Sequence, residues 1–396
     1  MSGSEHDNLA LSMLLVFGGA KIAGELFERL RMPAIVGEIV AGTILGPAVL
    51  HWVEWNTTLH ALAELGVMFL LFRVGLEVKS SELIAVGGRA LWVAMLGVIV
   101  PFVAGYGIAA AWGEPTLTST FVAAAMVATS VGITAQVLAA KGLLQTTSAR
   151  IILAAAVVDD ILGLLVLAVV SSFAKGDVNI AGLATTTVLA VGFTLFFTFW
   201  GTAAMRRIMP KVSASLRTGE VQFNFAMVFL FALAVGAAYA GVAAIVGAFL
   251  AGMALSESIS HRVHDLVGGV TELMVPFFLA GIGIQLDLRV LAEPSIFWFA
   301  VAISVAAVLS KLLGCGLAAR SLGRRTATQI GVGMVPRGEV GMVVAQIGMT
   351  MGVVPPHVYG VVVFMAILTT VIAPPLLAIA FRGEECGPSE ERFQLG

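Results

Sequence analysis

Residues 151–170 read IILAAAVVDDILGLLVLAVV, and this stretch indicates the class of the protein. As one helix it is long enough to cross the roughly 30 Å hydrocarbon core of a bilayer. Asp159 and Asp160 lie at its centre. An ionised carboxylate there is costly, so it faces a protein interior or a wet cavity. Burial favours the protonated form of an acid and a nearby cation favours the ionised form. The pair therefore predicts a group whose proton content depends on the cation present, and a purely structural polar pair is the alternative.

The composition is that of a polytopic helical membrane protein. Of the 396 residues, 59% are hydrophobic and 12% are charged, whereas soluble domains contain about 25% charged residues. The two cysteines, Cys315 and Cys386, have no spacing that predicts a disulfide or a metal site, and no cofactor is expected. The first ten residues lack a basic segment, so no cleavable signal peptide is predicted.

Apolar segments separated by charged residues, glycine or proline predict thirteen membrane spans. Of the 22 Lys and Arg residues, 17 fall on one side of the predicted membrane and two on the other. By the positive-inside rule, the N-terminus is expected outside and the C-terminus in the cytoplasm. The spans are expected near residues 8–28, 33–50, 58–76, 84–112, 117–140, 148–172, 179–205, 219–239, 242–256, 266–286, 295–318, 326–351 and 357–381.

The chain contains an internal repeat. Residues 34–46 (AIVGEIVAGTILG) align with residues 244–256 (AIVGAFLAGMALS) with seven identities in thirteen positions. Residues 64–78 align with residues 272–286 with six identities in fifteen. The two copies run in opposite directions in the predicted topology. Such inverted repeats are typical of secondary transporters, whose binding sites lie near the midplane between the repeats.

The repeat offset also pairs span 117–140 with span 326–351. Both are apolar helices with a predicted break, at residues 128–134 (ATSVGIT) in the first and at residues 336–341 (PRGEVG) in the second. Broken helices at membrane depth are tolerated where they line a cavity, and their free ends offer carbonyl groups to cations. The two breaks are therefore predicted to form one site.

Polar side chains at the two breaks are the first candidates for ion ligands. Thr129, Ser130 and Thr134 could supply hydroxyl oxygens, and the alternative for each is a bond to its own helix backbone. Arg337 and Glu339 lie two residues apart at the second break, where they could neutralise each other or the site.

Lys311 lies inside the predicted span 295–318. A lone ammonium in the membrane needs a partner, which predicts an ion pair between Lys311 and either Asp159 or Asp160. Successive helix positions point about 100° apart, so the two acids can face different partners. The alternative is that Lys311 extends to the cytoplasmic headgroups.

The motifs VVDDILGLLVL, ATSVGITA and PRGEVG, together with Lys311, resemble those of monovalent cation:proton antiporters of the second family, in particular bacterial NapA-type sodium/proton antiporters. The similarity covers nearly the whole chain. It implies an all-α polytopic NhaA-like antiporter fold of thirteen transmembrane helices, with inverted repeats and two discontinuous crossing helices. It further implies a core (ion-translocating) domain at residues 58–172 and 266–381, a dimerisation or scaffold domain at residues 8–50 and 179–256, and a cytoplasmic tail at residues 382–396.

The resemblance also implies a role for each site residue. Asp160 corresponds to the acid that binds Na⁺ or a proton in turn, and Asp159 to the acid that pairs with Lys311. Thr129 and Ser130 correspond to the crossover that supplies oxygens near the ion. Glu339 corresponds to the acid at the second crossover. Arg337 and Thr134 are expected to support the site because of their positions at the two breaks.

The expected function is exchange of Na⁺, and also Li⁺, for H⁺ across the bacterial inner (cytoplasmic) membrane by alternating access, with a role in pH homeostasis. The resemblance implies electrogenic exchange, because the Asp-Asp form with lysine is typical of electrogenic members. The alternative is a K⁺/H⁺ antiporter of the Kef-like branch, since oxygen ligands alone do not select between these cations.

A homodimer in the lipid bilayer is expected, without nucleic acid and without a nucleotide-binding domain in this chain. Enzymatic activity is not expected. An intramembrane aspartyl protease requires its two acids on different helices, whereas Asp159 and Asp160 are consecutive. A channel is the remaining rival to a carrier.

Overall fold

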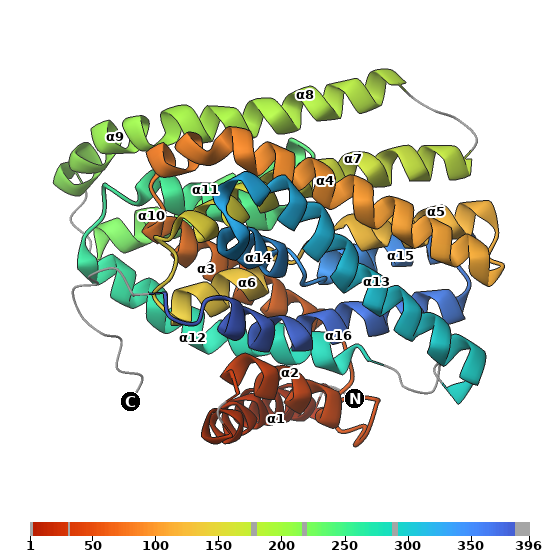
Figure 1. The fold of residues 1–396 in the computed structure, drawn as a ribbon. Coiled ribbons are helices and arrows are strands. Elements are labelled where there is room, and N and C mark those ends of the chain that lie inside the picture. Colours follow the sequence, from red (N-terminus) through yellow and green to blue (C-terminus); the bar gives the residue numbers. More distant parts are fainter. Residues whose placement is uncertain (1–2, 31, 176–179, 216–219, 287–291, 385–396) are drawn as a thin grey trace.

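The computed structural model describes residues 3–30, 32–175, 180–215, 220–286 and 292–384, and the regular elements in these ranges are helices (Figure 1). Ten stretches among these residues are both long and apolar enough to cross a bilayer, and three further apolar helices are shorter. A helix satisfies its own backbone polar groups, as a lipid environment requires. The expectation of an all-α polytopic fold is confirmed.

The first half of the chain consists of seven helices among the described residues. They are α1 (Gly3–Arg29), α2 (Ala34–Leu45), α3 (Thr57–Glu77), α4 (Ser80–Trp112), α5 (Thr116–Val127), α6 (Val131–Ala140) and α7 (Thr147–Lys175). The second half begins after a continuous helical connection, the rod (residues 180–215). Its helices are α10 (Val221–Tyr239), α11 (Ala244–Leu255), α12 (His261–Ile284), α13 (Pro294–Ala318), the short η3 (Arg320–Leu322), α14 (Arg324–Gly333), α15 (Glu339–Thr350) and α16 (Pro356–Ala380).

The rod between the halves consists of α8 (Ile180–Phe196), the π-helical turn η1 (Phe197–Gly201) and α9 (Thr202–Ser215), and it runs along one edge of the molecule (Figure 1). The helix continues beyond the predicted end of this span at residue 205, as far as Ser215. The cause is amphipathicity: Met205 and Met209 are buried while Arg206 and Arg207 are exposed. A polar helix face lets the helix continue beyond the point where hydropathy falls.

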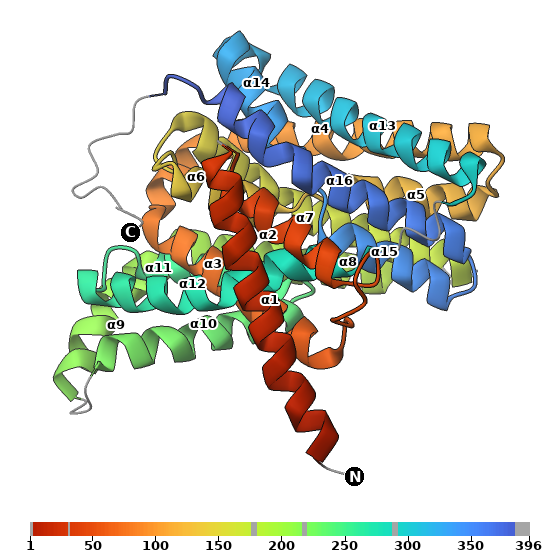
Figure 2. The same ribbon diagram turned by 90° about the horizontal axis from the view of Figure 1, so that it is seen from below.

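The helices pack in two groups. In the first group, α3 packs against α11 and α12, α12 packs against α2, and α1 and α10 cover α2 and α11. In the second group, α4 packs against α5, α7 and α13, while α13 contacts α14 and α16, and α15 contacts α5. Figure 2 shows α10, α11 and α12 on one side and α4, α13 and α14 on the other, with α1 running obliquely across the view.

Glycines at repeat-related positions allow the first group to pack closely. A methyl group at Gly42 of α2 would overlap the Ala280 carbonyl oxygen of α12, and one at Gly252 of α11 would overlap the Phe72 carbonyl oxygen of α3. Gly42 and Gly252 are separated by the repeat offset of 210 residues. In both repeats, therefore, a glycine allows the short helix to pack closely against the longer helix of the other repeat: α2 against α12, and α11 against α3.

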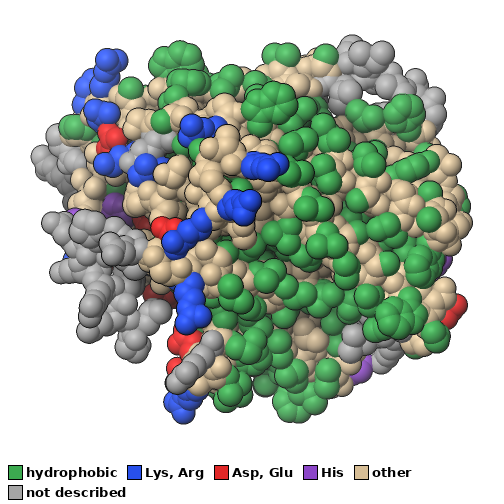
Figure 3. Space-filling model, viewed as in Figure 1, with side chains coloured by type: hydrophobic (Ala, Val, Ile, Leu, Met, Phe, Trp, Pro, Cys, Tyr) green, Lys and Arg blue, Asp and Glu red, His purple; other side chains and the backbone are tan. Residues whose placement is uncertain are grey.

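The surface matches a membrane setting. Figure 3 shows a broad hydrophobic face, with Lys and Arg side chains gathered towards the edge at which α9 lies. A broad apolar surface on a soluble monomer is rare, whereas in lipid it is the expected exterior.

Candidate functional site

Two interrupted helices meet inside the second group. The helix of the first predicted break stops at Val127 and resumes at Val131, and that of the second stops at Gly333 and resumes at Glu339. The backbone N–H of Ser130 donates to the carbonyl oxygen of Pro336, 2.8 Å away. Backbone groups released by a break need partners when buried. Here the two breaks satisfy each other directly.

The local sequences explain where the helices stop. Pro336 lacks an N–H for helical bonding, and the residue before a proline disfavours helical geometry. Gly338 permits the close approach, because a methyl group there would lie 2.5 Å from Ser130 Oγ and 2.6 Å from Ser130 Cβ. At the first break, Ala128 has a non-helical and Ser130 an extended backbone conformation.

The hydroxyls of the first break differ in their bonding. Thr129 Oγ1 and Ser130 Oγ are buried and have no hydrogen-bond partner among the described residues. Buried polar atoms are normally satisfied, so such oxygens suit a ligand. Thr134 Oγ1 instead donates to the carbonyl oxygen of Gly333, 2.7 Å away, and thereby joins α6 to the end of α14. Its hydroxyl proton is thus already used.

The two aspartates of α7 face different surroundings. Lys311 Nζ donates to Asp159 Oδ1 at 3.1 Å and to Oδ2 at 3.3 Å, and both side chains are completely buried. This is the pairing that the resemblance implied, and Lys311 does not extend to the surface. Asp160 borders a small pocket between α3, α6, α7 and α11, whose other lining residues are Leu71, Val131, Leu153, Val157, Val246 and Phe249. Asp160 is therefore the acid that faces the boundary between the two helix groups.

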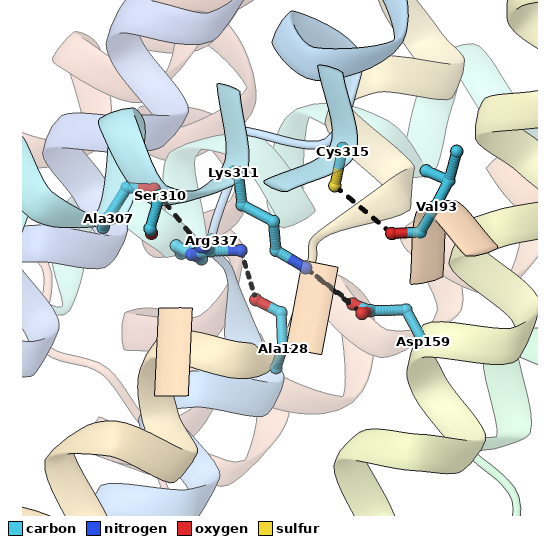
Figure 4. A network of polar contacts seen from close by, with 8 residues as sticks. All are labelled: Val93, Ala128, Asp159, Ala307, Ser310, Lys311, Cys315 and Arg337. Carbon is cyan, nitrogen blue, oxygen red and sulfur yellow. Dashed lines mark hydrogen bonds and ion pairs between the residues drawn. The ribbon is translucent and has the colours of Figure 1, made fainter. Parts of the chain in front are cut away.

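Arg337 is a second buried cation beside the ion pair (Figure 4). Its guanidinium donates to the carbonyl oxygen of Ala128 at the first break and to that of Ala307 in α13, each at 3.3 Å. It also attracts Asp159 electrostatically. Arg337 thus belongs to the second break and bonds to the first. The side chain of Glu339, the other charged candidate at the second break, lies outside the described residues.

Two features of the site were not predicted. Gly97 of α4 makes room for the ion pair, because a methyl group there would lie 3.2 Å from Lys311 Nζ and 2.9 Å from Cys315 Sγ. Thr369 and Thr370 of α16 bond to the backbone of Arg337. Nothing in the sequence distinguishes Gly97 from the other glycines of a chain that contains 44 of them. The adjacent threonines in an apolar span were a visible polar signal.

Comparisons with known proteins agree with this geometry. The model of the transmembrane sodium/hydrogen exchanger family matches residues 12–383. The Na⁺/H⁺-K⁺ antiporter GerN of Bacillus cereus is 35% identical over 376 residues, which cover 94% of this chain and 96% of GerN. The high-affinity Na⁺/H⁺ antiporter NhaS3 of Synechocystis sp. is 32% identical over 429 aligned residues, which cover 96% of this chain and 92% of NhaS3. A structure of the sodium proton antiporter MjNhaP1 from Methanocaldococcus jannaschii has a TM-score of 0.70 at 16% identity and covers 97% of both chains.

The family match and the antiporter relatives identify the chain as a secondary transporter and not an enzyme, and the two interrupted helices beside buried acids agree with that class. The chain belongs to the sodium/hydrogen exchanger family, and it exchanges cations for protons. The resemblance drawn from the motifs is confirmed at this level.

Proposed function

We propose that the chain exchanges Na⁺, and also Li⁺, for H⁺, and that Asp160 carries the cation and the proton in turn. The observation that carries this proposal is the position of Asp160 at a pocket between the two helix groups, on the helix whose other acid is already bound to Lys311. The unbonded hydroxyls of Thr129 and Ser130 are the proposed additional ligands, since alkali cations take oxygen donors.

The charges of the described side chains support the proposal that Na⁺ and H⁺ exclude each other at Asp160. Lys311 and Arg337 contribute two positive charges, and Asp159 and Asp160 contribute two negative charges when both are ionised. Binding either Na⁺ or H⁺ at Asp160 leaves one net positive charge, and binding both leaves two. Charge is costly in a low-dielectric interior, so the second cation is strongly disfavoured. Na⁺ arrival then expels the proton, and protonation releases Na⁺.

The ion pair supports a proposal about stoichiometry. Asp159 holds Lys311 in its ammonium form in the absence of Na⁺. A cation that enters beside Asp160 repels that ammonium and weakens its bond to Asp159, and loss of a proton from Lys311 then provides the second proton per Na⁺. Two protons exchanged for one Na⁺ make the transport electrogenic.

The packing favours a different domain division from the one at residues 58–172 and 266–381. We propose that α3 and α12 belong to the scaffold with α1, α2, α10 and α11, because glycine contacts hold them against α2 and α11. The moving core then consists of α4 to α7 and α13 to α16. The pocket at Asp160 lies at the boundary of these groups, so sliding of the core along α3 and α11 would open it to alternate sides.

We further propose thirteen spans with the N-terminus outside and the C-terminus in the cytoplasm of a bacterium. The ten long stretches, the short helices α2 and α11, and the pair α14 and α15 account for this number. The two broken spans are proposed to cross at Ser130 and Pro336, where their backbones bond. The edge that carries Lys and Arg in Figure 3 is then the cytoplasmic one.

A homodimer in the bilayer through α1 completes the proposal. Its Leu14 and Ile22 side chains are 68% and 74% exposed, on a helix that lies outside the rest of the bundle (Figure 2). The second candidate is K⁺/H⁺ exchange, because the relative GerN is a Na⁺/H⁺-K⁺ antiporter.

Proton movement in proteoliposomes tests the proposed exchange. A pH-sensitive dye reports the response to added Na⁺, Li⁺, K⁺ or choline chloride at equal ionic strength. We expect saturable responses to Na⁺ and Li⁺ at lower concentrations than to K⁺, and none to choline. A response to K⁺ at the lowest concentration would favour the second candidate.

A further inference from the structure

The backbone of Arg337 is held from a neighbouring helix at two points. Arg337 N–H donates to Thr369 Oγ1, 3.1 Å away, and the Arg337 carbonyl oxygen accepts from Thr370 Oγ1, 2.6 Å away. Both threonines are completely buried in α16. Arg337 lies between α14 and α15 and is not part of either helix, so its N–H and carbonyl groups have no intrahelical partners. Two adjacent hydroxyls therefore satisfy both polar backbone groups of one residue at the break.

The two threonines are suited to these different tasks. Thr369 Oγ1 donates its proton to the Ala366 carbonyl oxygen, 3.0 Å away, so its lone pair is turned towards Arg337 N–H. Thr370 instead donates to Arg337. Pro374 and Pro375 follow within α16, and a proline cannot bond the carbonyl four residues earlier. The helix is thus weakened by the prolines next to the residues that hold Arg337, and the bonds to the break are part of what fixes its position.

The held backbone determines where the guanidinium charge lies. Arg337 donates to Ala128 and Ala307 carbonyl oxygens, and its Nε has no partner among the described side chains and backbone groups. Asp159 attracts it. A guanidinium released from this position would therefore move towards Asp159, and its positive charge would then oppose a cation bound at the adjacent Asp160.

We propose that Thr369 and Thr370 are positioning residues that keep the Arg337 charge at the first break and away from the cation, and thereby set the affinity for Na⁺. Because this inference rests on the proposed function of Asp160, it predicts a change in Na⁺ affinity and in pH profile and not only in the amount of folded protein.

The test compares Thr370→Val, which removes the hydroxyl at nearly constant shape, with Thr370→Ser, which keeps it. Purified full-length variants are measured for the Na⁺ concentration that gives half-maximal exchange in liposomes and half-maximal thermal stabilisation in detergent, since the second readout needs no turnover. We expect T370V to raise both concentrations about tenfold, the factor that corresponds to the loss of one buried hydrogen bond. We expect T370S, which keeps the hydroxyl, to have the wild-type values. The optimum pH of T370V should move lower, because a nearer cation keeps the carboxylates ionised.

Thr271→Val is the matched control, because Thr271 is also buried but its hydroxyl bonds to Val267 of its own helix at 2.7 Å and to Phe69 of α3 at 3.5 Å, and not to either break. An unchanged Na⁺ dependence in T370V, a change equal to that of T271V, or failure of T370S to restore the wild-type values would overturn the proposal. If T370V does not fold, Thr369→Val removes the other bond and carries the same expectations. Asp160→Asn is measured in parallel: if it exchanges normally, the proposed function fails, and if only the T370V prediction fails, the fault lies with the positioning role.

Discussion

Lys311 Nζ lies 3.1 Å and 3.3 Å from the two carboxylate oxygens of Asp159, and neither side chain has exposed surface. Such a pair contributes little net stability because both groups lose their hydration, but either group alone is strongly destabilising. We therefore expect Lys311→Met to lower the free energy of unfolding by about 3–5 kcal/mol. The double variant Asp159→Asn, Lys311→Met should recover at least half of that loss. Thermal and chemical unfolding in detergent compare the wild type, the two single variants and the double variant. If the effects of the two single substitutions add up to that of the double variant, a direct pair is contradicted.

The same lysine is expected to control the electrical response. If Lys311 provides the second proton, a methionine there leaves Asp160 as the carrier of one proton per Na⁺. Currents recorded from proteoliposomes on a solid-supported membrane should then fall to near zero in K311M, while dye-detected exchange continues. Undiminished current per transported Na⁺ in K311M would exclude Lys311 as the source of that proton.

Gly338 is expected to tolerate no side chain. A methyl group there would lie 2.5 Å from Ser130 Oγ, so Gly338→Ala must displace the first break or its own. We expect the maximal rate of Na⁺-driven proton movement to fall more than about tenfold, since misplacement of ligands by 1 Å can cost about a hundredfold. Gly163→Ala is the control on α7, because a methyl group at Gly163 meets nothing within 4 Å. Similar rates in both variants would show that the contact at Gly338 is unimportant.

The repeat-related glycines should matter for stability. Gly42→Ala and Gly252→Ala each place a methyl group against a backbone carbonyl of another helix, which only helix movement can relieve. We expect each to destabilise the protein by about 1–3 kcal/mol, the usual cost of overpacking. Gly269→Ala, at an open position in α12, should change the melting temperature little. A melting temperature that all three variants share with the wild type would remove the support for close packing at these positions.

The proposed dimer predicts a specific cross-link. With Cys315 and Cys386 replaced by serine, Ile22→Cys should form a disulfide-linked or bis-maleimide-linked dimer in membranes, because this side chain is 74% exposed on α1. Ala20→Cys, completely buried on the same helix, should not. Cross-linking of neither variant, or of both equally, would argue against α1 as the contact.

Much of the fold could be predicted because the membrane restricts the choices. Long apolar runs must be helices, and the span that contains Asp159 and Asp160 is α7 almost residue for residue. The breaks were visible because Pro336 and Gly338 interrupt an otherwise apolar run. The end of α9 was missed because hydropathy does not detect an amphipathic continuation.

The arrangement of the site needed the structure. The sequence limited the partner of Lys311 to two adjacent acids, but helix rotation decides that it is Asp159. Thr134 was grouped with Thr129 and Ser130 by its hydroxyl, yet its bond to Gly333 depends on a residue 199 positions away. The proposed grouping of α3 with the scaffold likewise rests on backbone contacts at glycine that no composition pattern reports.

The most direct measurement is sodium-driven proton release from proteoliposomes that contain Asp160→Asn, with folded protein verified by its melting temperature and elution volume. Asparagine keeps the size of the side chain but holds neither a proton nor a charge. We expect no proton movement above that of protein-free liposomes at any Na⁺ concentration, and saturable movement in the wild type. Proton release by D160N at the wild-type rate would show that cation and proton do not compete for this carboxylate.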